Sequence, residues 1–407
     1  MGEPMKVVVL QGDGMADEPI AELGGKTPLD VARTPNLDHM ASRGILGLTR
    51  TIPRGLPPGS DVGTMSVLGY DPARYHTGRS PIEAASMGVA LGPDDVAFRM
   101  NLVTLESVEG GGEIMRDFAG GHPSREEGAA IVADLGTALG RDGLELHAGL
   151  SYRHLLVWRK GESRMRTTPP HDLTDKPVGR AFPDGPGADV LRDLIERSRP
   201  LLAEHARCHE RRVRGERAPT AVWFWGQGKR PRLPTLRERF GVDGAVIAAV
   251  DLVNGLGVLA GLHRITVPGA TGYLDTDFRA KAEYGLRALA ERDFLFLHVE
   301  APDECGHLGD PQKKVEAIEN FDEKTVGPLL EGLRAMGGDW RVLVMPDHPT
   351  PCALKTHTAD PVPFLVYVAA DEQKPRALSR GYNERDARDQ GIFIPDGHTL
   401  LERLLRR

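Results

Sequence analysis

The stretch KVVVLQGDG at residues 6–14 decides the fold expected of this chain, because an apolar run leads directly into an acidic turn. The run KVVVL at 6–10 is short, uninterrupted and rich in β-branched residues, which is typical of a strand buried on both faces of a parallel sheet. Similar runs recur near the far end of the chain: FLFLHV at 294–299, RVLVM at 341–345 and PFLVYV at 363–368.

Helix-like stretches separate these runs, and the clearest covers 310–336, where apolar residues recur at helical spacing. Alternation of strands and helices predicts an α/β fold with a parallel sheet and helices on both of its faces. Glycine and proline, 48 and 31 residues without any period, indicate many sharp turns. Loops should therefore carry much of the chemistry.

The middle of the chain has a different character and its own strand-like runs, AFRMNLVTL and HLLVWR. Residues that break regular structure flank it at 70–81 and at 181–189. We therefore expect a smaller inserted α/β domain over 76–185, which interrupts a main domain made of 1–75 and 186–407. One continuous α/β domain with long loops is the alternative.

Composition narrows the class of protein. A net charge of −7 disfavours a nucleic-acid or acidic-membrane partner, because such partners need a positive field. Cys208, Cys305 and Cys352 are too few and too widely spaced for a disulfide framework, which indicates a reducing compartment. Apolar runs stay far below the roughly 20 residues that span a bilayer, and no signal peptide is recognisable. The cytoplasm is the expected location, and nothing in the sequence indicates an oligomeric state.

Carboxylates and imidazoles fall at the ends of the predicted strands. They are Asp13 after the first run, Asp303 and His307 after the second, Asp347 and His348 after the third, and His357 before the last. One such Asp is more often a helix cap or turn residue than a ligand. Ligands in open parallel sheets bind beyond the carboxyl ends of the strands, so these side chains should converge. Their number and chemistry indicate two metal ions rather than one.

A nucleophile is indicated by LPPGSDVGTMSVLGYDP at 56–72. Pro-Pro-Gly is a rigid turn that can expose the hydroxyl of Ser60 at the start of the next helix, where backbone N–H groups favour an anion. A free serine hydroxyl is a poor nucleophile, and coordination to a metal activates it. An ordinary N-cap serine is the structural alternative.

Cationic side chains for an acidic substrate occur outside this set. They are Arg99, His122, Arg153 with His154, and Lys229 with Arg230. Several lie at strand edges or in glycine turns, where backbone and cation approach a phosphate or carboxylate together. Taken alone, each of these residues is more often a solvated surface charge than a substrate ligand. A Walker-type GxxxxGK[ST] motif is absent, which disfavours a P-loop kinase.

Ordered motifs over nearly the whole chain resemble one family, the archaeal-type, cofactor-independent phosphoglycerate mutases of the alkaline-phosphatase-like superfamily. The motifs are GDGMADEPI at 12–20, TPNLDHMA at 34–41, PPGSDVGTMSVLGYDP at 57–72, GRSPIEAASMGV at 78–89, VAFRMNLVT at 96–104, GLSYRHLLV at 149–157, TTPPHDLT at 167–174, WFWGQGKRP at 223–231 and HVEAPDECGHLGD at 298–310.

The resemblance implies a phosphatase-like domain that holds two metals and is interrupted by a substrate-binding insertion. It implies that one metal is surrounded by Asp13, Ser60, Asp347 and His348. It implies that the other is surrounded by Asp303, His307 and His357. Substrate roles carry over to His122, Arg153 and Lys229, while Asn101 and His154 stand in matching motifs.

The resemblance also implies an activity, the interconversion of 3-phosphoglycerate and 2-phosphoglycerate in glycolysis and gluconeogenesis. Ser60 would carry the phosphate, two divalent ions would assist it, and no 2,3-bisphosphoglycerate would be needed. Mn²⁺ is the first choice of metal, ahead of Mg²⁺, Co²⁺ and Zn²⁺. A homoserine kinase or a phosphomonoesterase on the same scaffold is the alternative, and a non-catalytic, metal-stabilised regulatory protein is a third.

Overall fold

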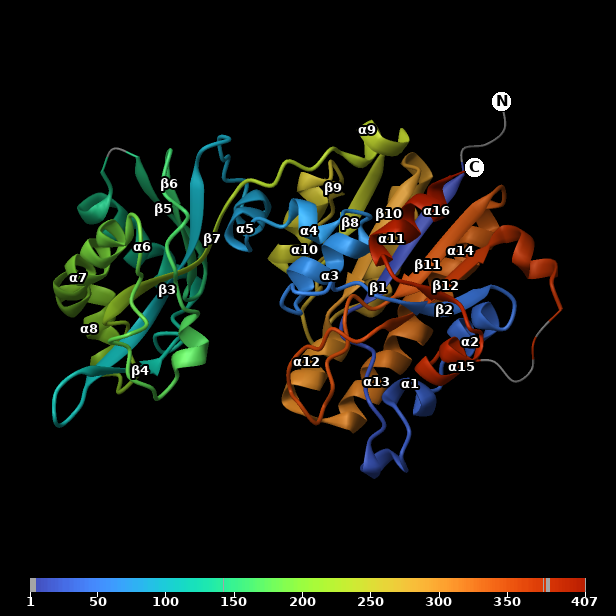
Figure 1. Cartoon of the computed structure of the whole chain (residues 1–407), viewed down its shortest axis with the longest axis horizontal. Coiled ribbons are helices and arrows are strands. Elements are labelled where there is room, and N and C mark those ends of the chain that lie inside the picture. The colour runs from blue at the N-terminus through green and yellow to red at the C-terminus, as the bar shows by residue number, and fades with distance from the viewer. Residues whose placement is uncertain (1–4, 142, 376, 378–380, 407) are drawn as a thin grey trace. The chain divides into compact units, whose positions relative to one another are not determined.

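The chain forms two compact units, which are described separately. The computed structural model describes residues 5–141, 143–375, 377 and 381–406. The first unit combines 1–76 with 232–407, and the second consists of 77–231 (Figure 1). The chain therefore leaves the first unit after residue 76 and returns to it at residue 232.

The first unit alternates strands with helices. Its strands are β1 (Lys6–Gly12), β2 (Ile45–Thr49), β8 (Gly244–Ile247), β9 (His263–Arg264), β10 (Phe294–Val299), β11 (Trp340–Met345), β12 (Val362–Val368) and β13 (Phe393–Ile394). Its helices are α1 (Pro28–Val31), α2 (Pro35–Ala41), α3 (Ser60–Val67), α4 (Pro72–Tyr75), α9 (Leu236–Phe240), α10 (Asp251–Leu259), α11 (Phe278–Glu291), α12 (Ala301–Leu308), α13 (Pro311–Phe321), α14 (Gly327–Met336), α15 (Glu384–Asp389) and α16 (Leu400–Leu405).

These strands form one sheet in the order β13-β2-β12-β11-β1-β10-β8-β9. The predicted parallel core is confirmed, because β1 pairs in parallel with both β10 and β11. The run at 363–368 differs from the expectation, because β12 lies antiparallel to β11. Its amino end consequently lies at the edge where β1, β10 and β11 end. This reversal is the reason that a residue preceding β12 can reach the same edge.

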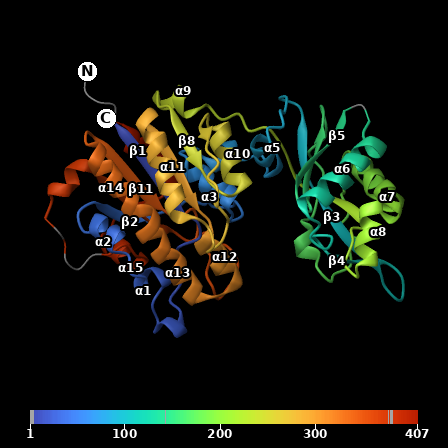
Figure 2. The same cartoon turned by 180° about the vertical axis from the view of Figure 1, so that it is seen from behind.

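Both faces of the sheet are buried, as the continuous apolar runs predict. Val8 and Leu10 of β1 belong to a core that contains residues of α11, α13 and α14, and the alternate residues Val7 and Val9 are equally buried. Figure 2 shows α11, α13 and α14 over one face. On the other face a Cβ at Gly257 of α10 would meet the side chain of Val246 in β8. Helices therefore cover both faces, and the confirmed class is α/β.

The helical stretch predicted at 310–336 is not continuous. A π-helical turn at Asp322–Val326 separates α13 from α14. The carboxylate of Asp322 accepts hydrogen bonds from the backbone N–H groups of Asn36 (3.2 Å) and Leu37 (2.7 Å), at the start of α2. The π-helical turn thus lies where the buried carboxylate of Asp322 holds the junction of α13 and α14 against the start of α2.

The second unit has a separate antiparallel sheet and core. Its strands are β3 (Val96–Ser107), β4 (Glu113–Asp117), β5 (Leu144–Leu150), β6 (Arg153–Trp158) and β7 (Ala221–Lys229). Its helices are α5 (Ser80–Ser86), α6 (Arg125–Leu139), α7 (Ala188–Glu204) and α8 (Ala206–Val213). Strand β3 pairs with β4, β6 and β7, always in antiparallel orientation.

The second boundary of the insertion differs from the expectation. We predicted a return to the main domain at 186, but α7, α8 and β7 belong to the second unit, which ends at Pro231. Strand β7 pairs along its whole length with residues 96–103 of β3, and α7 contributes Leu191 and Leu194 to the same core. Most of the breaker-rich segment at 181–189 is therefore a loop inside the second unit, and its last two residues begin α7. Among the described residues, no helix has the length and apolarity needed to cross a membrane.

Candidate active site

Carboxylates and imidazoles of the first unit gather at the carboxyl edge of its sheet. Asp13 follows β1, and its backbone N–H donates to the carbonyl of Val299 at the end of β10 (2.9 Å). Gly14 then turns the chain with φ of +59°, and a Cβ there would lie 2.6 Å from Oδ1 of Asp303. Only glycine combines this conformation with so close an approach. The GDG turn thus brings the ends of β1 and β10 together.

The first group consists of Asp13, Asp347 and His348. All three are buried, and one ligand atom from each lies within 4.8 Å of the others. Nε2 of His348 lies 3.3 Å from Oδ2 of Asp347 and 3.6 Å from Oδ1 of Asp13. Asp347 and His348 are neighbours in the loop after β11, so both reach one point. This arrangement suits a cation with mixed oxygen and nitrogen ligands.

Ser60 completes this group from another element. It is the first residue of α3, after Gly59 in extended backbone, and its Oγ lies 3.2 Å from Nε2 of His348. Farther along α3, the Thr64 hydroxyl accepts a hydrogen bond from Gln11 of β1 (2.9 Å) and donates to Asp347 (3.4 Å). Helix α3 is therefore fixed to the ligand strands, and Ser60 stands at its N-terminal end, where backbone N–H groups favour an anion.

The second group consists of Asp303, His307 and His357. Nε2 of His307 lies 3.2 Å from Oδ2 of Asp303 and 2.9 Å from Nε2 of His357. Asp303 and His307 are one turn apart on α12, as their spacing predicted, and His357 precedes the reversed strand β12. The rings of His348 and His357 lie 4.1 Å apart, so the two groups adjoin. The structure thus brings all seven predicted ligand residues together.

The cluster contains buried carboxylates whose ionised forms need positive charge nearby. Burial raises the pKa of Asp13 well above its usual range, and the carboxylates of Asp347 and Glu300 add to the effect. For Asp303, burial is outweighed by hydrogen bonds from His307 and His357, which hold its pKa well below the usual range. The same bond to Asp303 raises the pKa of His307 to about 9. The imidazolium of His307 therefore supplies charge that a bound cation would supply instead.

Two details of the geometry fit a divalent metal. Oδ1 of Asp13 is buried and has no hydrogen-bond partner among the described residues, although it faces the imidazole of His348. The Nε2 atoms of His307 and His357 point at each other, where at most one hydrogen can lie between them. Carboxylate oxygens and imidazole nitrogens in this number suit Mn²⁺, Zn²⁺ or Co²⁺. The residues present therefore fit the predicted metals.

Several neighbours of the ligands were not predicted. His298 is buried, and its Nε2 lies 2.7 Å from Oδ2 of Asp13, while burial lowers its pKa to about 3. The neutral ring thus donates from Nε2 and orients the carboxylate. The hydroxyl of Thr350 bonds to Oδ1 of Asp303 and lies 3.2 Å from Nδ1 of His348. The one available signal was a histidine inside an otherwise apolar buried strand.

Glu300 joins His298 and Asp13 in a third group of ligand-type atoms. Nε2 of His298 lies 3.3 Å from Oε2 of Glu300. Lys281 of α11 is buried behind them and donates to the carbonyl of His298 (3.4 Å). Burial lowers the pKa of Lys281 to about 8, against the opposing influence of Glu300. This lysine places an internal positive charge beside the third group.

The second unit contains a cluster of arginines around one carboxylate. Glu83 of α5 is paired with Arg99 (3.1 Å) and with Arg79 (2.9 Å). The guanidinium of Arg99 lies 4.5 Å above the ring of Trp225, and the ring of His171 meets that tryptophan edge-on at 5.3 Å. Arg99 thus stands against an aromatic ring that helps to fix its orientation.

The charge of this cluster is predominantly positive. Burial lowers the pKa of Arg99 to about 10 even though Glu83 opposes the shift, and Arg79 and Arg153 lower it further. Although burial opposes it, the charges of Arg99 and Arg79 keep the pKa of Glu83 below its usual range. Three guanidinium groups therefore share one ionised carboxylate, which favours an anionic ligand.

The other predicted substrate residues are placed differently. Arg153 is exposed beside Tyr152, and Lys229 lies 3.5 Å from Asp94. His154 points to the opposite side of β6, where it is buried and accepts a hydrogen bond from the Gly149 backbone N–H (3.1 Å). Asn101 is also buried. Its amide donates to the Phe118 carbonyl and accepts from the Trp225 indole, both at 3.0 Å.

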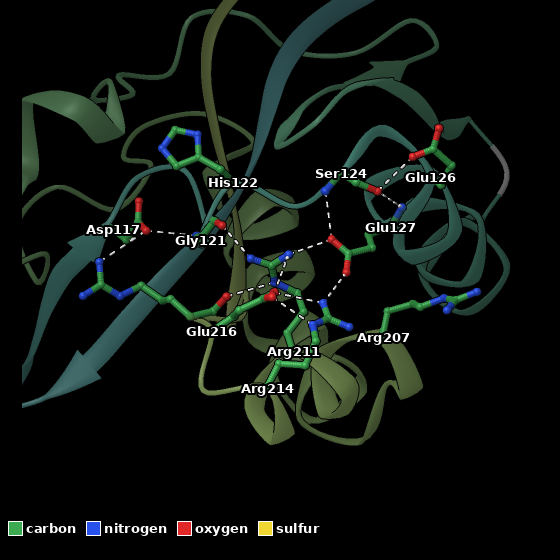
Figure 3. A pocket seen from close by; sticks show the side chains of 11 residues that line it. Asp117, Gly121, His122, Ser124, Glu126, Glu127, Arg207, Arg211, Arg214 and Glu216 are labelled. Atoms are coloured by element: carbon green, nitrogen blue, oxygen red, sulfur yellow. Dashed lines mark hydrogen bonds and ion pairs between the residues drawn. The ribbon is translucent and has the colours of Figure 1, made fainter.

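His122 is exposed in a turn with φ of +54°, and its ring meets that of Tyr152 at 5.4 Å. It also lies at the rim of a cavity of about 920 Å³. Figure 3 shows its imidazole pointing away from the charged side chains of that cavity. There Arg211 and Arg214 bond to Glu127 (2.6 and 2.7 Å). The ring of His122 thus packs against Tyr152.

A parallel α/β sheet whose strand ends gather carboxylates and imidazoles around a half-buried serine defines a class, the metal-dependent phosphoryl-transfer enzymes. Comparison with known proteins narrows the class. Residues 41–207 match the family model described as 2,3-bisphosphoglycerate-independent phosphoglycerate mutase. The enzyme of that name from Methanosarcina barkeri is 49% identical over 403 residues, which cover 99% of this chain and 100% of the relative. That from Methanothrix thermoacetophila is 46% identical over 404 residues and covers 98% and 100%.

Solved structures agree with these relatives. A protein from Pyrococcus horikoshii is 30% identical, has a TM-score of 0.82, and covers 99% of this chain and 97% of its own. A cofactor-independent phosphoglycerate mutase from Thermoplasma acidophilum shares the fold, with a TM-score of 0.66 at 24% identity and coverage of 98% and 99%. The chain belongs to the family of 2,3-bisphosphoglycerate-independent phosphoglycerate mutases, which are isomerases.

Proposed function

We propose that this chain interconverts 3-phosphoglycerate and 2-phosphoglycerate, with Ser60 carrying the phosphoryl group between the two positions. One observation carries the proposal: Oγ of Ser60 lies 3.2 Å from Nε2 of His348, inside a cluster of seven ligand-type residues. A hydroxyl at a helix start and beside buried carboxylates is suited to phosphate chemistry only when cations share the site. The choice of phosphoglycerate as the substrate rests on the family to which the chain belongs.

Two divalent cations would be held at the sheet edge. One would take ligands from Asp13, Ser60, Asp347 and His348. The other would take them from Asp303, His307 and His357. Bound there, such ions would lower the pKa of the serine hydroxyl and neutralise charge on the phosphoryl oxygens. Mn²⁺ is our first choice, because oxygen and imidazole ligands are mixed in each set.

The chemistry of the protein itself is a pair of transfers. In the first, a bond forms between Oγ of Ser60 and phosphorus while the bond from phosphorus to the 3-oxygen of glycerate breaks. The hydroxyl proton of Ser60 ends on that oxygen. Glycerate then turns within the site, and its 2-hydroxyl reverses these events, so that Ser60 regains a proton. The N–H groups at the start of α3 are suited to hold the phosphoryl oxygens throughout.

Retention of glycerate separates a mutase from a phosphatase, and we assign this role to the second unit. Arg153 and His122 flank Tyr152 on its surface, and Arg79 and Arg99 form the adjacent cationic cluster. A carboxylate pairs with guanidinium groups through two parallel hydrogen bonds, which fixes orientation as well as position. Lys229 is a weaker candidate, because Asp94 lies within 3.5 Å of its ammonium group.

The relatives favour this reaction over that of a homoserine kinase or a phosphomonoesterase. The two relatives are named as phosphoglycerate mutases, and this chain matches each of them over its full length. The experiment that tests the proposal supplies the full chain with Mn²⁺ and 3-phosphoglycerate, without nucleotide or bisphosphoglycerate. Formation of 2-phosphoglycerate is expected. Phosphate release alone would support a phosphomonoesterase, and activity only with ATP and homoserine would support the kinase. A role in glycolysis and a cytoplasmic location stay predictions.

A further inference from the structure

A buried lysine links the two loops that carry most of the predicted metal ligands. Lys314 lies on α13, with no exposed side-chain surface. Its ammonium group lies 2.8 Å from Oδ2 of Asp17, 2.8 Å from the carbonyl of Thr350 and 3.1 Å from the carbonyl of Ala16. An ammonium group has three hydrogens, so these three acceptors use its whole donor capacity.

The acceptors belong to two different ligand loops. Ala16 and Asp17 lie in the segment between β1 and the next helix, shortly after Asp13, and Thr350 lies in the segment between β11 and β12, shortly after Asp347. The backbone N–H of Thr350 also donates to the carbonyl of Ala16 (3.2 Å). Asp17 reinforces the link, because its Oδ2 accepts from the backbone N–H of Cys352 (3.1 Å). Lys314 therefore ties the two ligand loops to each other.

Thr350 connects Lys314 to both groups of predicted metal ligands. Its carbonyl accepts from Lys314, while its hydroxyl bonds to Oδ1 of Asp303 and lies 3.2 Å from Nδ1 of His348. Asp303 belongs to the second group of ligands, and His348 to the first. A displacement of the Thr350 backbone would thus disturb one ligand in each group.

The position of Lys314 in its helix argues for a specific role. Lys314, Ala317, Ile318 and Phe321 form the buried stripe of α13, where apolar residues are expected. A buried ion pair is often no more stabilising than well-packed apolar residues of similar volume. A charge at this position is explained by its directional hydrogen bonds rather than by stability alone.

We infer that Lys314 is a positioning residue for the metal centre: it clamps the loops after β1 and β11 so that the ligands of both cations are held in register. The inference rests on the two-metal site proposed above and is independent of the identity of the substrate. Partners that orient metal ligands typically contribute roughly 10- to 100-fold to metal affinity. Because every ligand is kept when Lys314 is replaced, excess metal should restore the centre.

The test is a titration of the full chain, freed of metal by a chelator, with Mn²⁺ alone, followed by calorimetry. Lys314→Met should bind Mn²⁺ roughly 10- to 100-fold more weakly at both sites, and its isomerase activity should recover as Mn²⁺ is raised. Lys313→Met is the matched control, because the neighbouring Lys313 is half exposed and its ammonium group pairs with Asp310 (3.7 Å) instead of with either ligand loop. It should bind Mn²⁺ as the unmodified chain does.

A merely structural lysine would lower the melting temperature without changing Mn²⁺ affinity in the folded protein, and that outcome overturns the inference. Weaker Mn²⁺ binding at only one of the two sites overturns the inference as well, because Lys314 is inferred to position ligands of both cations. If Lys314→Met does not fold, the neutral pair Asp17→Asn with Lys314→Gln takes its place under the same two criteria. Failure of the unmodified chain to bind Mn²⁺ would instead contradict the proposed metal centre.

Discussion

Ser60 is the residue on which the proposed chemistry depends. Its hydroxyl is one of several groups at the first metal position, so Ser60→Ala should keep both ions and the fold. Isomerisation should fall by roughly 10⁴-fold or more, as is typical when a covalent nucleophile is removed. Coupled assay of 2-phosphoglycerate formation, together with elemental analysis, measures both quantities. Normal turnover in this variant would show that Ser60 serves as a helix-start residue only.

His307 and Asp347 provide the contrasting case. His307 contacts Asp303 and His357 directly, and Asp347 contacts His348. We expect His307→Ala and Asp347→Asn to lose metal as well as rate, because each removes a ligand that no neighbour replaces. Mass spectrometry for metal content after desalting checks this. Unchanged stoichiometry in both variants would contradict the assignment of two cations.

Arg153 tests retention of glycerate. Its exposed guanidinium, beside Tyr152, is free to bind two oxygens of a carboxylate. Arg153→Ala should lower isomerisation by roughly 100-fold through misplacement of the substrate. Release of phosphate should rise relative to isomerisation, since glycerate leaves before it is phosphorylated again. Arg153→Lys should recover only part, because it supplies a point charge. An unchanged ratio of the two products would remove Arg153 from the site.

At the scale of elements, the docking of α15 onto the turn after β1 depends on one buried carboxyl group. Glu384 accepts hydrogen bonds from the Asp17 backbone N–H (3.1 Å) and the Thr27 hydroxyl (2.7 Å). Burial raises its pKa from 4.5 to about 7. The folded state therefore holds this proton more tightly than the unfolded state does. Its contribution to stability is complete below pH 4.5 and declines as pH rises to about 7.

This linkage predicts that the free energy of unfolding loses about 3 kcal/mol from this group between those limits. Glu384→Gln keeps an acceptor oxygen and a similar volume but carries no titrating proton. Its stability should therefore vary less with pH over the same interval, and urea denaturation at several pH values measures the difference. Parallel pH profiles for the two proteins would show that Glu384 does not titrate as described.

The elements also show what the sequence determines and what it leaves open. Asp303 and His307 were correctly placed on one helical face, because their spacing of four residues is a local property of a helix. The direction of β12 and the partner of β7 are properties of distant strands, and no local pattern distinguishes them. His298 and Lys314 were missed for a related reason: each occupies a position whose pattern predicts an apolar residue. Their roles follow only from partners far away in the sequence.

At the scale of the whole molecule, the second unit should fold without the first. Residues 77–231 form one core that includes Trp223 and Phe224 of β7 and Leu194 of α7. We expect a fragment of 77–231 to unfold cooperatively on heating. A fragment of 76–185, which has the bounds predicted from the sequence, should not unfold cooperatively, because it lacks α7, α8 and β7. Circular dichroism of both fragments tests this, and cooperative unfolding of the shorter one would contradict the boundary at Pro231.

The central claim is that one phosphoryl group passes through Ser60 and returns to the same glycerate. Its most direct test uses 3-phosphoglycerate labelled in both halves, with heavy carbon in the glycerate and heavy oxygen in the phosphoryl group, mixed with unlabelled substrate. The full chain is supplied with Mn²⁺ and no bisphosphoglycerate, and the masses of the 2-phosphoglycerate are measured early in the reaction. The account predicts product that carries both labels or neither. Product that carries only one label, or no 2-phosphoglycerate at all, would contradict it.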